Sequence, residues 1–172
     1  DRNLRGLNRK LTIYENLAAA QIGQKRFSRG GVLNKRAMLD NALALAKRYD
    51  IRPPEPLLPT SSLSGGNAQK VVVAREVEIG ANLLIASQPT RGVDIGAIES
   101  IESILQKVKA QGVGVLLVSA DLREILSLSD RILVMYEGRI TGEVAAGAAT
   151  EDRLGILMMG GADSAAPKEA AT

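Results

Sequence analysis

The sequence has 172 residues, of which 45% are hydrophobic, and its formal net charge is +3. A chain of this length buries roughly 70% of its unfolded surface, so an ordinary domain can fold without covalent staples. Cysteine and histidine are both absent, which excludes disulfides, thiolate nucleophiles, histidine general bases and zinc sites built from nitrogen or sulfur ligands. No apolar run reaches the ~20 residues that span a bilayer, and the first residues lack the apolar core of a signal peptide.

Positive charge is concentrated in the first third of the chain. Residues 1–50 hold 11 Lys or Arg against 4 Asp or Glu, whereas the remainder holds 11 against 15. Nucleic acid is one class of partner for such a basic region, but these basic clusters have little aromatic interleaving. We interpret the region as a solvated basic face and expect no nucleic-acid partner.

The same first third is predicted to form a small helical lobe. Thr12 and Glu15 have the spacing of a capping box and start a short helix that reaches Gln21. Asn34 starts a stronger helix, in which the apolar residues follow the helical period up to Tyr49. Four prolines after it prevent continuation and form a connector.

Strands and helices alternate in the rest of the chain. The expected elements are a helix over 70–79, a strand over 83–87, a helix over 95–111, a strand over 113–119, a helix over 121–128, a hairpin of 132–136 and 139–144, and a helix over 150–159. The strand over 113–119 is continuously apolar after Gly114, as in a strand that is buried on both faces. This order predicts a three-layer α/β core, and the residues after Gly160 are predicted to be disordered.

The most informative stretch for chemistry is Leu63-Ser64-Gly65-Gly66-Asn67-Ala68-Gln69-Lys70. At the start of a helix, one hydroxyl and two Cβ-free residues present N–H groups at the positive helix end, which favours an anion. The two glycines also allow a phosphate to approach the main chain closely. The bland alternative is a serine N-cap after a flexible turn, and for Ser-Gly-Gly alone that alternative is the commoner one.

The surroundings of this stretch point to a family. The LSGGN sequence, the apolar strand that follows it, and then Gln88-Pro89-Thr90-Arg91-Gly92-Val93-Asp94 resemble the nucleotide-binding domains of ABC transporters. The resemblance covers nearly the whole chain, because Ser129-Asp130-Arg131-Ile132 and Glu137-Gly138-Arg139-Ile140 are similar to the terminal strands of that family. It implies that LSGG is the signature motif and that the strand is Walker B, running into a D-loop formed by Gly92, Val93 and Asp94.

The family implies a fold class and a division of the chain. The class is α/β, as a partial P-loop ABC-type nucleotide-binding domain together with its α-helical signature subdomain. The signature subdomain would cover residues 1–75, the α/β core part residues 76–160, and a disordered tail residues 161–172.

Departures from the family pattern are as informative as the matches. Ser87 and Gln88 stand where the family has the Walker B aspartate that orients Mg²⁺ and the adjacent general-base glutamate. Ser87 supplies no anionic oxygen to the hard cation, and Gln88 accepts no proton from water. Ala120 stands where the family has its switch histidine, so it contacts no γ-phosphate. Three coordinated losses predict a naturally degenerate site rather than a laboratory substitution.

A Walker A sequence, Gly-x-x-x-x-Gly-Lys-Ser/Thr, does not occur in the chain. The backbone nest and the lysine that cradle the β- and γ-phosphates are therefore missing. We expect the chain to be a fragment of a longer parent that carries the P-loop half upstream, and we expect no ATP hydrolysis by the fragment alone. Apolar surface on the core sheet should then be exposed, with marginal stability or self-association as the result.

The family also implies how such a fragment works. Two cassettes pair head to tail, so the signature of one closes over ATP held by the other. Ser64, Gly65 and Gly66 would contact the γ-phosphate of a partner-bound ATP, with Asn67 and Gln69 as supporting polar neighbours. ATP and Mg²⁺ would be cofactors of the assembled transporter, and none is expected for the isolated chain.

The sequence narrows the subfamily. Thr-Arg-Gly-Val-Asp, together with an Asn in the signature, is similar to the double-cassette importers of monosaccharides and nucleosides, and Ala-Ser-Gln-Pro-Thr looks most like the nucleoside branch. The implied partners are the upstream half, the first cassette, membrane permease subunits and, indirectly, a substrate-binding protein, at the cytoplasmic face of the membrane. No residue here chooses the substrate.

Two other classes of protein stay open. One is a soluble ABC ATPase that acts on nucleic acid or ribosomes, which a coiled-coil insertion or a basic linker would favour; this sequence has neither. The other is a purely structural α/β domain in which the phosphate-loop sequence arose by chance. The order of the motifs along the chain argues against this class.

Overall fold

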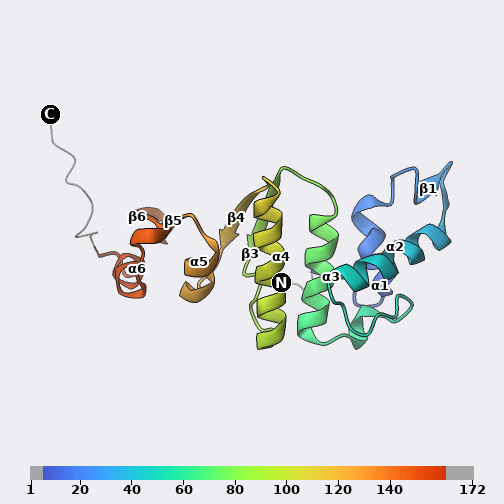
Figure 1. The fold of residues 1–172 in the computed structure, drawn as a ribbon, viewed down its shortest axis with the longest axis horizontal. Coiled ribbons are helices and arrows are strands. Elements are labelled where there is room, and N and C mark those ends of the chain that lie inside the picture. The colour runs from blue at the N-terminus through green and yellow to red at the C-terminus, as the bar shows by residue number, and fades with distance from the viewer. Residues whose placement is uncertain (1–5, 162–172) are drawn as a thin grey trace. The chain divides into compact units, whose positions relative to one another are not determined.

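A computed structural model describes residues 6–161 (Figure 1). The chain divides into two compact units, with the boundary in the sequence between Leu116 and Leu117. The first unit contains α1 (Ile13–Ala18), the 3₁₀ helix η2 (Ala19–Gln21), β1 (Ser28–Arg29), β2 (Val32–Leu33), α2 (Lys35–Arg48), the 3₁₀ helix η3 (Thr60–Ser62), α3 (Gly65–Val77), β3 (Leu83–Ser87), α4 (Ile95–Ala110) and the start of β4 (Gly114–Val118). The second contains the end of β4, α5 (Leu122–Leu128), β5 (Arg131–Tyr136), β6 (Arg139–Ala145), the 3₁₀ helix η4 (Ala146–Ala148) and α6 (Glu151–Met158).

Local capping explains where the helices of the lobe begin. Thr12 caps α1, and its capping box with Glu15 is present as predicted. Asn34 caps α2 by accepting from the amide of Ala37. Buried Asn16 then ties the lobe together, because its side-chain amide donates to the carbonyls of Asn8 and Thr12 at 3.0 Å each.

A second polar tie joins the end of α2 to the end of α3. The hydroxyl of Tyr49 donates to Oε1 of Glu78 at 2.8 Å, and Arg48 pairs with the same oxygen at 2.7 Å. Burial, and then the adjacent carboxylate, raise the pKa of the Tyr49 hydroxyl, so it remains a donor at neutral pH. The two helix ends are thereby held together.

The sheet of the first unit has an open apolar surface. β3 and β4 neighbour each other in a two-stranded sheet. Leu83, Ile85 and Leu116 are exposed by 56%, 65% and 51% of their surfaces, respectively. The expectation of a strand over 113–119 that is buried on both faces is therefore wrong, because exposed and half-buried residues alternate along β4. Within the described residues, no further element covers the exposed apolar side chains of Leu83, Ile85 and Leu116. Self-association of the chain through this surface stays a prediction.

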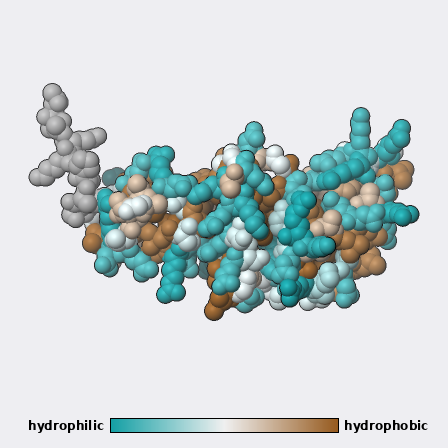
Figure 2. All heavy atoms as spheres, viewed as in Figure 1, coloured by the Kyte–Doolittle hydropathy of each residue, from teal (hydrophilic) through white to brown (hydrophobic). Residues whose placement is uncertain are grey.

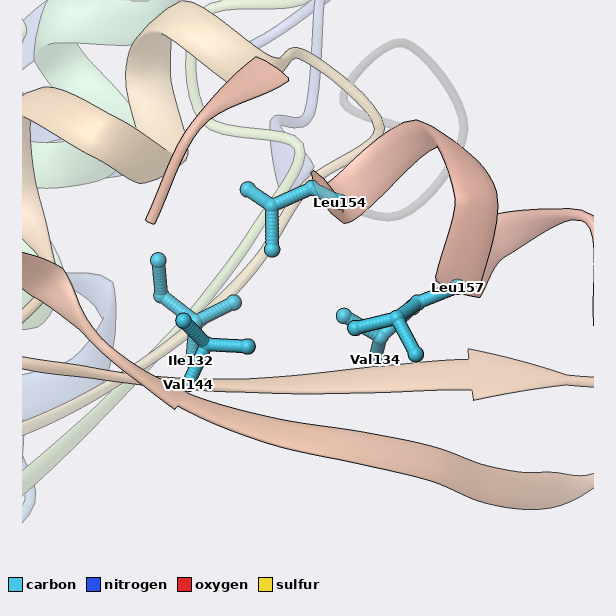
Figure 3. Packing of buried hydrophobic residues seen from close by; sticks show 5 residues of the cluster. All are labelled: Ile132, Val134, Val144, Leu154 and Leu157. Carbon is cyan, nitrogen blue, oxygen red and sulfur yellow. The ribbon is translucent and has the colours of Figure 1, made fainter. Parts of the chain in front are cut away.

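The second unit is built on a hairpin. β5 and β6 pair antiparallel, and their turn residues Glu137 and Gly138 have φ values of 47° and 77°, which a type I′ turn requires. A small apolar core lies between the hairpin and α6 (Figure 3), formed by Ile132, Val134, Val144, Leu154 and Leu157. Gly142 permits this packing, because a Cβ there would lie 2.8 Å from a methyl of Leu157.

Two features of the fold differ from the predicted elements. The β1–β2 hairpin was not predicted, and α3 begins at Gly65 instead of at residue 70. The functional division at residue 75 stays a prediction; that position lies inside α3. The predicted disordered tail lies almost entirely outside the described residues.

Within residues 6–161, none of the helices combines the length and the apolar character needed to cross a membrane.

Candidate functional site

The site is built around the first turn of α3. Ser64 is the N-cap, and its Oγ accepts from the backbone amide of Asn67 at 3.3 Å and from the side-chain amide of Asn67 at 3.0 Å. Ser64 and Gly65 are exposed. Because the first amides of a helix have no intrahelical acceptor, this end offers N–H groups and a hydroxyl to an anion.

Asn67 connects this helix start to the connector that follows α2. Its Oδ1 accepts from the backbone N–H of Arg52 at 2.7 Å, while its Nδ2 donates to Ser64. The side chain therefore uses both ends of its amide to fix two loops at once. A glutamine has one more rotatable bond and would place the same groups elsewhere.

Lys70, one turn further along α3, holds the same connector. Its side chain is only 8% exposed, and its Nζ donates to the carbonyl of Asp50 at 2.9 Å and to the carboxylate at 3.1 Å. Arg52 donates from Nε to the other carboxylate oxygen at 2.7 Å. The buried ammonium is thus paired, as a buried charge must be, and Asp50 itself has a left-handed backbone with φ of 51°.

Acid should weaken this connection. The hydrogen bond from Arg52, and then that from Lys70, hold the pKa of Asp50 below its ordinary value of 3.8. A carboxyl with a lowered folded pKa stabilises the protein above its unfolded pKa, and that contribution is lost as the pH falls through the folded pKa. We expect the free energy of unfolding to drop below about pH 4, and to drop less in Asp50→Asn. Parallel denaturant titrations of both proteins between about pH 3 and pH 7 measure this difference, and superimposable pH profiles would contradict it.

The start of α3 packs directly on the start of α4. Asp94 is the N-cap of α4, and its Oδ1 accepts from the amide of Ala97 at 2.9 Å. A Cβ on Gly66 would lie 2.5 Å from Cβ of Ala97 and 2.7 Å from Oδ2 of Asp94. Only glycine fits there without a shift of the neighbouring helix, so the two helix starts are in contact through Gly66.

A shallow hollow of about 250 Å³ lies where these parts converge. Its lining residues come from the connector and from the two helix starts: Asp50, Arg52, Gly66, Asn67, Lys70, Asp94, Gly96 and Ala97. Two helix N-termini, Arg52 and Lys70 contribute positive potential, and Asp50 and Asp94 offset part of it.

The structure brings together three of the predicted site residues: Gly66, Asn67 and Asp94 all line the hollow. Gln69 is buried and does not line it. Its predicted supporting role stays a prediction. Sequence reasoning missed Asp50 and Arg52, and it named Lys70 only as part of the motif.

The predicted D-loop and the degenerate positions are placed as follows. Gly92 has φ of 67°, and Val93 is half-buried, just before the N-cap of α4. Ser87 is exposed at the end of β3, and Gln88 follows in the left-handed region with φ of 50°. Ala120 is exposed in the second unit, between β4 and α5.

Ser87 and Gln88 do not fit a magnesium ion. Mg²⁺ prefers at least one carboxylate with near-octahedral oxygen ligands, whereas Ser87 and Gln88 provide only neutral oxygens. Across residues 6–161, no group of three or more acidic side chains has the arrangement that could hold a metal. The start of α3, in contrast, has the donors that suit a phosphate.

Curated proteins with similar sequences are import ATP-binding proteins. The chain is 43% identical over 168 residues to the guanosine import ATP-binding protein NupO of Bacillus subtilis, which covers 98% of this chain and 33% of that protein. It is 42% identical to the glucose import protein TsgD13 of Haloferax volcanii, covering 96% and 30%, and 40% identical to the ribose import protein RbsA of Bacillus subtilis, covering 91% and 31%. The chain therefore spans about a third of the length of these relatives. No protein-family model matches it.

Solved structures of ATP-binding cassettes have the same fold. The dimeric post-hydrolysis state of the cassette MJ0796, bound to ADP and Pi, aligns with a TM-score of 0.68 at 26% identity, over 81% of this chain and 59% of that one. An ATP-binding subunit of an ABC transporter aligns with a TM-score of 0.68 at 21% identity, over 89% and 64%. The mixed helix and strand content of the chain thus corresponds to part of such a cassette.

Proposed function

Because this chain is part of an ABC-type ATP-binding cassette, related to the ATP-binding proteins of sugar and nucleoside importers, we propose that it serves energy coupling in an importer by donating its signature to the ATP site of a partner cassette. The transported compounds would be simple sugars or nucleosides, like the guanosine, glucose and ribose in the names of the relatives.

The start of α3 is the observation that carries this proposal. Ser64 and Gly65 are exposed at a positive helix end. Asn67 holds Ser64 in place by a hydrogen bond and is itself held by the backbone N–H of Arg52. Facing a partner-held ATP, the hydroxyl and the first-turn amides would donate to the γ-phosphate, where negative charge grows during transfer. Gly66 would keep that turn in contact with the D-loop through Asp94.

The chain's own nucleotide site is proposed to be degenerate. ATP hydrolysis needs Mg²⁺ to neutralise the phosphates and a base or positioning group for the attacking water. Ser87 and Gln88 supply neither an anionic ligand nor a proton acceptor, and Ala120 has no polar atom for a γ-phosphate. One competent site and one degenerate site per assembled pair is the arrangement that these residues support.

The remaining partners follow from the class of the relatives. We propose that the cassette works with a first cassette, with its own upstream half and with permease subunits at the cytoplasmic face of the membrane, and that it meets a substrate-binding protein only through the permease. The soluble alternative on nucleic acid or ribosomes gains no support from the relatives named above, which are all import proteins.

Titration of the purified chain with Mg-ATP tests the proposal first. We expect no heat of binding, because the chain lacks a P-loop and its Walker B positions hold no carboxylate. Addition of a cassette that carries the P-loop should then restore ATPase activity. Tight binding with turnover by the chain alone would overturn the assignment of Ser87, Gln88 and Ala120 to a degenerate site.

A further inference from the structure

The β1–β2 hairpin is the part of the lobe that the proposed function leaves unused. It lies at the outer end of the lobe, away from α4 (Figure 1). Ser28 pairs with Leu33, Arg29 pairs with Val32, and the amide of Asn34 donates to the carbonyl of Phe27 at 2.8 Å. Phe27 is 1% exposed, so the base of the hairpin is anchored in the lobe while its tip stands in solvent.

The second strand of the hairpin is both apolar and exposed. Val32 is 73% exposed and Leu33 is 52% exposed, and Ile22, which precedes the hairpin, is 42% exposed. Aliphatic side chains on a short projecting hairpin contribute nothing to the core. They gain free energy only if another surface covers them.

Basic residues flank these aliphatic residues in the sequence. Between Glu15 and Asp40 the sequence carries five basic residues and no acidic one. These are Lys25, Arg26, Arg29, Lys35 and Arg36, all of them exposed. Lys25, Arg29 and Arg36 form no ion pair with other residues of the described range 6–161. Figure 2 shows hydrophobic and strongly hydrophilic residues side by side over this end of the lobe.

From this combination we propose that the segment 22–36, which we call the basic hairpin, contacts the anionic surface of a lipid bilayer. The cations are drawn to the negative potential of acidic headgroups, and Ile22, Val32 and Leu33 enter the boundary between headgroups and acyl chains. The contact is peripheral and reversible, because three aliphatic side chains are far too few for insertion.

Charge and shape favour a bilayer over nucleic acid. Single-stranded nucleic acid is bound by stacking on exposed aromatic rings, but Phe27, the only aromatic residue of the hairpin, is buried beneath the guanidinium of Arg26 at 4.3 Å. Exposed aliphatic residues beside the cations add nothing to phosphate contacts, whereas they suit a surface with an apolar layer beneath its charge.

Sedimentation with vesicles tests the proposal on the whole chain, without nucleotide or a partner cassette. Vesicles of phosphatidylcholine are compared with vesicles that contain about 30 mol% phosphatidylglycerol. We expect binding at least about tenfold stronger to the anionic vesicles, and most of it lost when NaCl rises from roughly 0.05 M to 0.5 M. Because ATP is absent, a lack of vesicle binding would count against this proposal alone and would not bear on whether the signature contacts ATP held by a partner cassette.

Matched variants locate the contact. Arg29→Glu with Arg36→Glu should abolish the preference for anionic vesicles, whereas Lys107→Glu with Arg139→Glu, an equal change in net charge at exposed sites elsewhere, should leave most of it.

Val32→Ser with Leu33→Ser should weaken binding about tenfold, and Leu57→Ser with Ile140→Ser, at similarly exposed positions, should not. The proposal would be overturned if each control variant lost as much vesicle binding as the test variant matched to it. Equal binding to both kinds of vesicle, or tighter binding to a short DNA duplex than to the anionic vesicles, would also overturn it.

Discussion

Gly66→Val should lower the ATPase activity of the assembled parent by about 100-fold or more, as expected for loss of a positioned donor to the transferred phosphoryl group. A side chain at position 66 meets Cβ of Ala97 at 2.5 Å and Oδ2 of Asp94 at 2.7 Å, so the first turn of α3 must move away from α4. The displaced turn no longer presents Ser64 and its amides in the geometry that a γ-phosphate requires. Steady-state turnover with saturating Mg-ATP measures the effect.

Two further proteins separate a folding defect from a loss of function at this position. Gly155→Val is the matched control, because a Cβ at position 155 meets nothing within 4 Å; its activity should stay near that of the unmodified parent. Crowding by a larger residue at position 66 should cost about 1–3 kcal/mol of stability. Gly66→Ala combined with Ala97→Gly removes the closest atom, Cβ of Ala97, and should regain part of that loss. Unchanged turnover in Gly66→Val would contradict the signature interpretation.

Glu124→Met should raise the free energy of unfolding by about 1–3 kcal/mol. Glu124 lies in α5, is 2% exposed, and neither of its carboxylate oxygens has a hydrogen-bond partner. A buried polar group that finds no partner costs its desolvation energy, and an apolar side chain of similar length avoids that cost. Denaturant unfolding of the whole chain, followed by circular dichroism, gives the difference.

Controls for this change come from the same chain. Glu99→Met, at an exposed position on α4, should change the stability by less than about 0.5 kcal/mol. Glu124→Gln should give a smaller gain than Glu124→Met, since the amide removes the charge but still lacks partners. A clear loss of stability in Glu124→Met would mean that the carboxylate has a stabilising partner.

Features of the fold that depend on near neighbours in the chain could be predicted from the sequence. Thr12, Asn34, Asp121 and Thr150 all cap the helices that were predicted to start beside them. Each of these caps joins a side-chain oxygen to an amide two or three residues further on, so the sequence contains the whole interaction. The signature motif was found for the same reason, because its residues are consecutive.

Features that depend on distant residues could not be predicted. Asp50 and Lys70 are 20 positions apart, and Arg52 and Asn67 are 15 apart, and no periodic pattern connects either pair. The start of α3 was placed too late because glycines are poor helix formers, and packing against α4 overrides that preference at Gly66. β1 and β2 have two residues each, which is too short for any alternation.

The contact between Gly66 and Ala97 also restricts which substitutions these two positions can accept during evolution. Any residue other than glycine at position 66 is penalised while Ala97 and Asp94 keep their present atoms. A larger residue at position 66 therefore requires a smaller residue at position 97 or a shift of the neighbouring helix start. The two positions, 31 residues apart in the printed sequence, should vary as a pair, with glycine at 66 persisting wherever 97 holds alanine.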